Sequence, residues 1–408
     1  MRDQPSTHPR AAVVGVCLLA TVCLLVAASS LTRTTSAAFT DTTETTAGFV
    51  ADIPPTPTLA WGNGSRGQLG DGTTTNTQAT PTPVAGAHTF HMAAAGDQYT
   101  CAIDAAGAAW CWGAGFNGRL GDGTVDVQRS TPVAVSGGHI FAAIGAGQNH
   151  TCAIDTTGAA WCWGAASNGQ LGIGVETADQ SVPTAVLGGH TFTDISVGVE
   201  FSCGLDTDGA AWCWGEGSSG RLGNGGTTDQ RTPSPVHGTH VFTAISAGLA
   251  HACAIDTVGS AWCWGYSSNG PLGNGSVTGF HSTPVAVLGG HTFTDITAGY
   301  FHTCAIDTAG AMWCWGDGLR GQRGDGTTTR PQGTPVAVLG NITASRIAAG
   351  SNHTCAIDTT AAAWCWGWNS QGQLGDGMTQ DQTSPVAVVG GHVFSDVSGG
   401  SSHTIAVP

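Results

Sequence analysis

A tetrapeptide, Trp-Cys-Trp-Gly, recurs through the chain at an almost constant interval. Its second Trp falls at six positions, with successive steps of 51, 51, 50, 51 and 51 residues: Trp112, Trp163, Trp214, Trp264, Trp315 and Trp366. One step upstream stands Trp61-Gly62, which makes seven copies of Trp-Gly. A fixed period near 50 residues is typical of propellers and other repeat arrays, so the 408 residues predict one repeat architecture rather than two or three separate domains.

Each copy divides into four short strands separated by Gly-rich stretches. Residues 190–198, 151–155, 159–164 and 131–135 exemplify the first to the fourth strand, and a G-x-L-G-x-G element (GQRGDG in the sixth copy) follows each Trp-Gly. No window inside the repeats carries apolar residues at i, i+3, i+4 and i+7 over three turns, so helices are not expected there. Four antiparallel strands per repeat, arranged radially, predict an all-β propeller.

The two ends of the repeat region are complementary halves of one blade. The first Trp-Gly belongs to a third strand at 59–62, whereas the chain ends with a first strand at 392–398 and a second strand at 403–407. We therefore expect a seven-bladed β-propeller over 59–408, closed by pairing of the N- and C-terminal half-blades. An open solenoid is the alternative, but it gives no reason for the two ends of the repeat region to be complementary half-blades.

The charged residues exclude one class of function. The chain contains 12 Arg and no Lys, its net charge is −15, and only 10% of its residues are charged. A nucleic-acid-binding protein needs Lys and Arg to neutralise phosphates, so a nucleic-acid partner is not expected.

Twelve of the 14 cysteines recur as pairs ten residues apart: Cys101 and Cys111, Cys152 and Cys162, Cys203 and Cys213, Cys253 and Cys263, Cys304 and Cys314, Cys355 and Cys365. In the first pair, a three-residue turn at 105–107 would place Cys101 opposite Cys111. Opposed residues have Cα atoms about 4.5–5.5 Å apart, within the roughly 4.4–6.8 Å that a disulfide needs. In the closing blade both positions change together, to Ile405 and Ala60. We therefore predict one cross-strand disulfide in each of six blades; the alternatives are a zinc site, which favours closer C-x₂₋₄-C spacing, and a catalytic thiol.

The N-terminal residues agree with the oxidising compartment that disulfides require. Arg2 and Arg10 precede 22 uncharged residues, and the Ser-Ala-Ala at 36–38 resembles a signal-peptide cleavage site. Residues 1–38 therefore predict a signal peptide, with an uncleaved membrane anchor as the alternative because 22 residues can span a bilayer. Residues 39–58 are rich in Thr and Pro, which is a linker composition.

The repeats resemble those of a known family. The phrases A-G-x-x-H-T-C-A-I, W-G and G-Q-L-G-D-G are similar to the repeats of the regulator of chromosome condensation (RCC1-type) family, and the resemblance covers 59–408. It implies a seven-bladed propeller, in agreement with the count of copies. The added cysteine pair resembles that of exported bacterial members.

The resemblance does not support every activity known in the family equally well. One member is a nucleotide-exchange factor for a small nuclear GTPase, a partner that an exported protein would not meet. Plant ultraviolet-B receptors use Trp in a G-W-R-H-T phrase, and the corresponding phrases here contain no Trp. A secreted bacterial β-lactamase-inhibiting protein shares the fold and binds an enzyme, which favours protein binding and keeps an enzyme-inhibitor scaffold as an alternative.

Histidine recurs at two positions per repeat. One set lies at the start of the second strand (His150, His251, His302, His353 and His403), and the other lies at the start of the first strand (His88, His139, His190, His240, His291 and His392). Residues repeated around a ring are typical of structural roles, and metal binding or proton relay is the alternative. For the Asp of C-A-I-D we expect turn formation rather than calcium binding. For the Trp pairs we expect packing between blades rather than carbohydrate stacking.

The copies differ in three segments: the two residues before His-Thr, the stretch after Trp-Gly, and the stretch before the fourth strand. Aromatic residues concentrate there in the fifth and sixth copies, and they are our candidate protein-binding residues: Tyr266, Phe280, Tyr300, Phe301 and Trp368. No nucleophile–base–acid constellation stands out, so we expect no catalytic residue, no metal site and no cofactor.

These observations predict an extracellular or cell-surface, monomeric propeller that binds an unidentified protein, with membrane contact only through 1–38 if that segment is retained. The alternatives are an enzyme or enzyme-inhibitor scaffold with a site on one face, and a guanine-nucleotide exchange regulator of a small GTPase.

Overall fold

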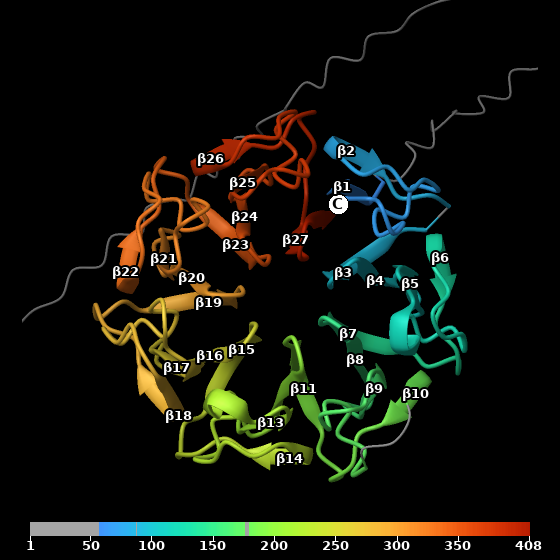
Figure 1. The fold of residues 1–408 in the computed structure, drawn as a ribbon, viewed down its shortest axis with the longest axis horizontal. Helices are drawn as coiled ribbons and strands as arrows, with labels where there is room; N and C mark the ends of the chain where they lie inside the picture. Colours follow the sequence, from blue (N-terminus) through green and yellow to red (C-terminus); the bar gives the residue numbers. More distant parts are fainter. Residues whose placement is uncertain (1–56, 87, 176–178) are drawn as a thin grey trace, which may run out of the picture. The chain divides into compact units, whose positions relative to one another are not determined.

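A computed structural model describes residues 57–86, 88–175 and 179–408, which form seven four-stranded antiparallel sheets around a central axis (Figure 1). Six sheets follow the chain order, β3 to β6 through β23 to β26, and are called blades 1 to 6. The seventh has the order β2-β1-β28-β27 and is called the closing blade. The predicted seven-bladed propeller closed by half-blades is therefore confirmed.

Each blade has an inner strand, two central strands and an outer strand. The inner strands are β3 (Phe90–Ala95), β7 (Phe141–Ala146), β11 (Phe192–Val197), β15 (Phe242–Ala247), β19 (Phe293–Ala298), β23 (Ala344–Ala349) and β27 (Asp396–Gly399). The second strands are β4 (Tyr99–Asp104), β8 (His150–Asp155), β12 (Phe201–Asp206), β16 (His251–Asp256), β20 (His302–Asp307), β24 (His353–Asp358) and β28 (His403–Val407). The third strands are β5 (Ala109–Gly113), β9 (Ala160–Gly164), β13 (Ala211–Gly215), β17 (Ala261–Tyr266), β21 (Met312–Gly316), β25 (Ala363–Gly367) and β1 (Leu59–Gly62). The outer strands are β6 (Arg129–Ala134), β10 (Gln180–Ala185), β14 (Gln230–Pro235), β18 (Phe280–Ala286), β22 (Gln332–Ala337), β26 (Gln382–Ala387) and β2 (Gln78–Pro83).

The central hairpin of each complete blade has the predicted register. In blade 1, Cys101 pairs with Cys111 and Ile103 with Ala109, and the structure joins the cysteines in a disulfide. The other five complete blades have the same bridge, which joins Cys152 with Cys162, Cys203 with Cys213, Cys253 with Cys263, Cys304 with Cys314, and Cys355 with Cys365. The predicted pairing of all twelve cysteines is thus the pairing in the structure.

The strands approach one another more closely at these bridges than we expected. In all six disulfides the two Cα atoms lie 4.1 Å apart, below the expected 4.5–5.5 Å. The hydrogen bond from Asp104 N to Ala108 O fixes the alternation of pairs along the hairpin and makes Cys101 and Cys111 a non-hydrogen-bonded pair. Such pairs are the closer kind, with Cα atoms about 4.5 Å apart, and the remaining difference has no explanation in the strand pairing.

The first strand of the closing blade is shorter than predicted. It begins at Asp396, which pairs with Val407, rather than at residue 392. In complete blades the ladder starts one pair earlier, with Phe192 opposite Asp206 for example. The residue at that position in the closing blade is Pro408, which has no N–H to donate.

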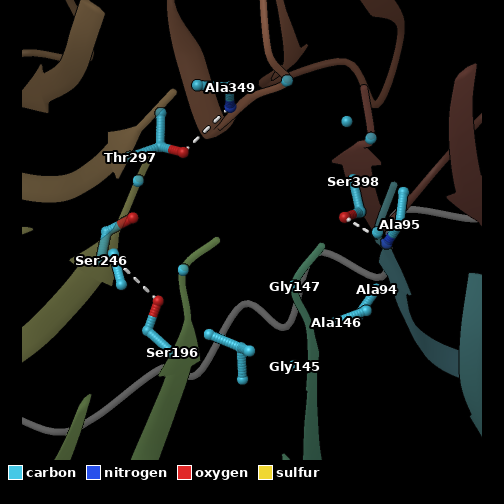
Figure 2. A pocket seen from close by; sticks show the side chains of 18 of the residues that line it. Ala94, Ala95, Gly145, Ala146, Gly147, Ser196, Ser246, Thr297, Ala349 and Ser398 are labelled. Carbon is cyan, nitrogen blue, oxygen red and sulfur yellow. Dashed lines mark hydrogen bonds between the residues drawn. The ribbon is translucent and has the colours of Figure 1, made fainter. Parts of the chain in front are cut away.

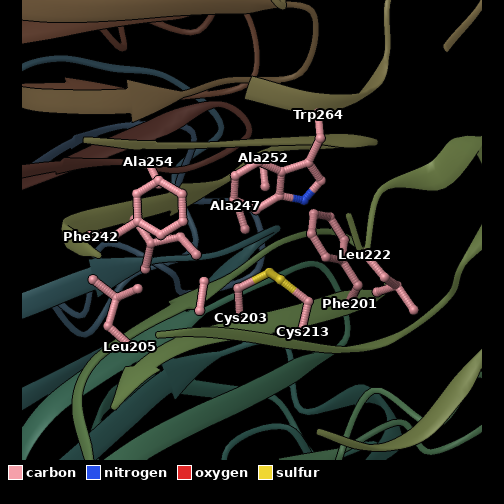
Figure 3. Packing of buried hydrophobic residues seen from close by; sticks show 12 residues of the cluster. Phe201, Cys203, Leu205, Cys213, Leu222, Phe242, Ala247, Ala252, Ala254 and Trp264 are labelled. Atoms are coloured by element: carbon pink, nitrogen blue, oxygen red, sulfur yellow. A yellow bond between two sulfur atoms is a disulfide. The ribbon is translucent and has the colours of Figure 1, made fainter. Parts of the chain in front are cut away.

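The blades pack face to face through the second Trp of each Trp-Cys-Trp. Figure 3 shows one interface, in which Trp264 and Phe242 of blade 4 lie against the Cys203–Cys213 disulfide of blade 3. The seven second Trp side chains are fully buried, whereas the first Trp of each pair is only half-buried. Five of these first Trp side chains pack at the margin of an interface core: Trp110, Trp161, Trp212, Trp262 and Trp313. The expected packing of the Trp face on the neighbouring Cys/Ile face is confirmed for the second Trp.

Helical structure in the described residues is confined to two short 3₁₀ turns, η1 (Phe116–Gly118) and η2 (Ser218–Gly220). Within those same residues, no helix is long and apolar enough to cross a membrane. The predicted signal peptide or anchor at 1–38 and nearly all of the predicted linker at 39–58 lie outside the described residues.

Candidate functional site

The three variable segments of each copy converge on one face of the ring. In blade 1, Gly113 at the end of β5 pairs with both Tyr99 and Arg129, so the turn before β4, the loop after β5 and the approach to β6 all lie at that end. We call this end the loop face. The opposite end, called the hairpin face, carries the central hairpin turns such as 104–108 and the links between blades such as 135–140. Sequence differences between copies are therefore concentrated on the loop face.

Three of the five candidate aromatic residues lie together on the loop face. Tyr266 and Phe280 are paired across β17 and β18 of blade 4. The ring of Phe301, from blade 5, lies 5.8 Å from the ring of Tyr266. Phe280 is 51% exposed, so the cluster presents a large apolar side chain to solvent. We call these three residues the aromatic cluster.

The other two candidates lie on the same face but outside this cluster. Tyr300 lines the mouth of the central cavity, where burial raises the pKa of its phenol. Trp368 follows β25 in blade 6, at the position that Tyr266 holds in blade 4. The equivalent residue of the intervening blade 5 is Asp317, so the aromatic surface is not continuous between blades 4 and 6.

The histidines that begin the second strands bond neighbouring blades together. His302 Nε2 lies 2.9 Å from Thr354 Oγ1 of the next blade. The Thr354 hydroxyl donates to Gln322 O, which also accepts from Trp366 Nε1, so His302 Nε2 must be the donor to Thr354. Equivalent contacts join His403 to Thr100, His150 to Ser202, His251 to Thr303, and His353 to Thr404.

Two interfaces depart from this pattern. Tyr99 replaces the histidine in blade 1, and its hydroxyl lies 2.9 Å from Thr151 Oγ1. Phe201 replaces it in blade 3, where the opposing hydroxyl residue is also lost, to Ala252. The paired loss shows that the contact between the two positions matters more than the histidine itself.

Burial lowers the pKa of these histidines far below the ordinary value, to about 3 for His150, His251, His302 and His403 and to about 4 for His353. They are therefore neutral at physiological pH. The second ring nitrogen of each, Nδ1, is buried and has no hydrogen-bond partner among the residues that the structure describes.

The second set of histidines lies on the hairpin face. His139 packs against Trp161 with ring centroids 4.0 Å apart and the two ring planes tilted by 42°. Trp161 Nε1 donates to Asp155 Oδ2, and Asp155 Oδ1 accepts from the N–H groups of Thr157 and Ala159 in the turn. These hydrogen bonds outweigh burial and hold the pKa of Asp155 below its usual value. The repeated Asp thus forms the hairpin turn, as predicted, and no three His, Cys, Asp or Glu side chains in the described ranges approach one another closely enough to hold a metal ion.

The inner strands surround a central cavity of about 340 Å³ lined mainly by Gly, Ala and Ser. Hydroxyl groups bridge four of the interfaces there, because the N–H groups of Ala247, Ala298, Ala349 and Ala95 donate to Ser196, Ser246, Thr297 and Ser398. Figure 2 shows the bonds from Ala349 to Thr297 and from Ala95 to Ser398. Ala94, Gly145 and Ala348 stand at the equivalent positions of the other inner strands. The hydroxyls accept bonds from neighbouring strands, so they hold the ring together at its centre.

Sequence reasoning missed three buried arginines in the loops of the loop face. Arg221 is paired with Glu216, and Arg323 with Asp325. Arg119 is 1% exposed and has no carboxylate within 4.0 Å among the residues that the structure describes. The sequence does show that Arg119 and Arg221 stand at position x of the G-x-L-G element, where other copies have Gln or Pro. Only the contacts in the structure show that Arg221 has a carboxylate partner and that Arg119 has none within 4.0 Å among the described residues.

The chain was compared with known proteins. Residues 57–406 match the family model described as the RCC1-like domain. The ultraviolet-B receptor UVR8 of Arabidopsis thaliana is 30% identical over 331 residues, which are 79% of this chain and 63% of the receptor, so the chain spans less than two thirds of that relative's length.

Two solved structures have the same fold. Human WBSCR16 superposes with a TM-score of 0.80 at 19% identity, covering 86% of this chain and 99% of that structure. Prp20p of Saccharomyces cerevisiae superposes with a TM-score of 0.77 at 21% identity, covering 87% and 91%, and is described together with its binding to Gsp1p and histones. At these identities the superpositions show the fold alone.

Proposed function

The chain belongs to the RCC1-like domain family, and from that premise we propose that it is an exported protein-binding module, without catalysis of its own, whose loop face carries the partner site. The observation that carries the proposal is the convergence of all three variable segments, with the aromatic cluster, on one face of an otherwise repetitive ring. Exposed aromatic residues on a rigid scaffold are the usual anchors of protein interfaces.

The export part of the proposal rests on the six disulfides and on the N-terminal sequence. Disulfides form and persist in oxidising compartments, and twelve cysteines paired within hairpins are not expected in a protein of the reducing cytosol. An exported propeller would not meet an intracellular GTPase, so we do not propose nucleotide exchange.

The proposed surface includes Tyr300 and Trp368 as well as the aromatic cluster, because all five side chains lie on the loop face. Prp20p, described as binding Gsp1p and histones, supports protein binding as one use of this fold. We propose a monomer that binds one protein partner there.

The experiment is capture of partners from culture on the immobilised chain, followed by recapture with two single variants. Phe280→Ser removes the most exposed ring of the cluster. Val258→Ser makes a matched change on the hairpin face, where Val258 is 72% exposed. We expect Phe280→Ser to reduce recovery of a captured protein at least tenfold and Val258→Ser to leave it unchanged, with equal thermal stability in both. Retention by Phe280→Ser together with loss by Val258→Ser would contradict the proposal.

A further inference from the structure

Arg119 is a buried cation with no carboxylate within 4.0 Å among the described residues of an acidic protein; Asp97 acts on it only from a longer distance. Its Nε donates to Ala114 O and its Nη1 to Gln148 O, but Nη2 is buried and has no hydrogen-bond partner in the described part of the chain. Buried charges are normally paired, because an uncompensated charge in the interior is strongly destabilising. Among the residues that the structure describes, none neutralises this guanidinium at ion-pair distance.

Blade 3 shows what occupies the equivalent position when the partner is present. Arg221 corresponds to Arg119, and its Nη1 lies 2.5 Å from Glu216 Oε2. Its Nη2 donates to the hydroxyl of Ser218, which in turn donates to Glu216 Oε1. Both guanidiniums also bond the backbone of the next blade, at Gln148 O and Leu249 O.

In blade 1 both partners of the arginine are replaced by apolar residues. Ala114 stands at the position of Glu216, and Phe116 at that of Ser218. The Phe116 ring lies 5.2 Å from the Arg119 guanidinium and is 39% exposed. Tyr99 lies 4.7 Å away from the same guanidinium, and Arg66 of the closing blade lies 5.7 Å from the Phe116 ring.

These contacts make a small site on the loop face with two cations and an exposed aromatic ring. Arg66 has no ion pair among the described residues, as is also true of Arg119. The Phe116 ring, which lies against the Arg119 guanidinium, is the exposed part of this site. A polyanion such as a nucleic acid or an anionic membrane is disfavoured by the net charge of −15, whereas a single carboxylate is not.

We propose that Arg119, with Arg66 and Phe116, binds an acidic side chain of the protein partner, whose carboxylate takes the place that Glu216 holds in blade 3. The partner residue beside that carboxylate is apolar and packs on Phe116. The choice of a protein as the source of the carboxylate rests on the proposed function. The site itself is separate from the aromatic cluster, so the two can fail independently.

The experiment titrates the full chain with the blocked dipeptide acetyl-Glu-Leu-amide and follows the side-chain Nε–H resonances of arginine by NMR. The Arg119 resonance is assigned from Arg119→Gln, which installs the residue found at the equivalent positions Gln68, Gln170 and Gln373. We expect a saturable shift of the Arg119 signal with a Kd of about 1 mM, equivalent to roughly 4 kcal/mol. Acetyl-Gln-Leu-amide should give no saturable shift.

The matched control is Ala114→Glu with Phe116→Ser, which copies the Glu216 and Ser218 pair of blade 3 into blade 1. It should abolish the response to the Glu dipeptide, because the site then contains its own carboxylate. The proposal is overturned if the Glu dipeptide gives no saturable shift, if the copied pair leaves the response unchanged, or if inorganic phosphate binds as tightly as the dipeptide. The aromatic-cluster variants test the proposed function separately, since none of them touches Arg119.

Discussion

The closing blade and the six complete blades have the same register between their two central strands, but only the complete blades join these strands covalently. In the closing blade, β1 and β28 pair Ala60 with Ile405 in the register in which β20 and β21 pair Cys304 with Cys314. A complete blade joins these strands by a short hairpin and a disulfide. In the closing blade the two strands come from opposite ends of the repeat region, and they are joined by non-covalent contacts. The blade geometry therefore does not depend on the disulfide.

The same inter-blade network crosses both interfaces of the closing blade. His353 contacts Thr404 on one side, and His403 contacts Thr100 on the other. Trp61 Nε1 donates to Gln373 O of the preceding blade, and five other second Trp side chains donate to the equivalent carbonyl: Trp112, Trp163, Trp264, Trp315 and Trp366. This network specifies how blades stack, and the disulfides add stability where the chain is already closed locally. The pairing of β1 with β28 is thus the place where the ring should open first.

A disulfide across the closing blade should have the largest effect on stability. Ala60→Cys with Ile405→Cys would close a loop of 346 residues, for which the chain-entropy model gives about 6 kcal/mol. Denaturant unfolding of the double variant, with Ala60→Cys alone as control, measures the gain. A double variant that forms the bridge without becoming more stable would show that the ring does not open at this pairing.

Removing one native disulfide should cost less. Cys304→Ile with Cys314→Ala copies the Ile405 and Ala60 pair into blade 5, so packing is preserved and only the cross-link is lost. Each native bridge closes a loop of 11 residues, which corresponds to about 2.8 kcal/mol. The double variant should remain folded and lose about that amount in denaturant unfolding. Failure to fold would mean that blade geometry does depend on the bridge.

Acid should destabilise the ring through the buried histidines. Their pKa is about 3 to 4 in the folded chain and about 6.5 when unfolded, so the unfolded state binds more protons between these values. Stability is therefore fully present above about pH 6.5 and falls as pH decreases, by about 1.4 kcal/mol per pH unit for each histidine.

A paired substitution isolates one of these histidines. His403→Phe with Thr100→Ala copies the Phe201 and Ala252 pair at the edge of the closing blade, and should reduce the slope of stability between about pH 6 and pH 4 by about 1.4 kcal/mol per unit. His302→Phe with Thr354→Ala is the matched change between two disulfide-bonded blades. An unchanged slope in both variants would contradict the assignment of neutral, buried histidines.

The smallest effect concerns a hairpin turn that the closing blade lacks. Ala361 occupies the turn position that is Gly in the other five hairpins, and its φ is +67°. A side chain in this conformation costs about 1 kcal/mol, so Ala361→Gly should raise the unfolding free energy by about that amount. Gly310→Ala is the reverse control, and it should destabilise because its Cβ would lie 2.5 Å from Thr343 Cγ2. A lower melting temperature for Ala361→Gly would contradict this.

Much of the fold was predictable because the sequence contains seven copies of the same four-stranded repeat. The position of Cys101 opposite Cys111 follows from the turn length alone, and the closing pair follows from Ile405 and Ala60 changing together. The contact between His302 and Thr354 depends on how two blades stack, which no single copy encodes. The sequence indicates this contact only where Phe201 replaces the histidine and Ala252 replaces the hydroxyl residue of the next blade.

The candidate site was predictable only in part. Variation between copies identified the aromatic residues, but their common face follows from the pairing of Gly113 with both Tyr99 and Arg129. The sequence does not show that Phe301 approaches Tyr266, because the contact crosses between blades. Arg119 could not be recognised as unpaired until the structure showed that Arg221 pairs with Glu216, because Ala114 stands at the position of Glu216 in blade 1.

The central claim is that the loop face binds the partner, and hydrogen exchange of the full chain with and without a captured protein tests it most directly. We predict slower exchange at 265–280 and 299–302 on the loop face, and unchanged exchange in hairpin turns such as 307–311. Protection confined to the hairpin turns, with no change at 265–280, would contradict the account.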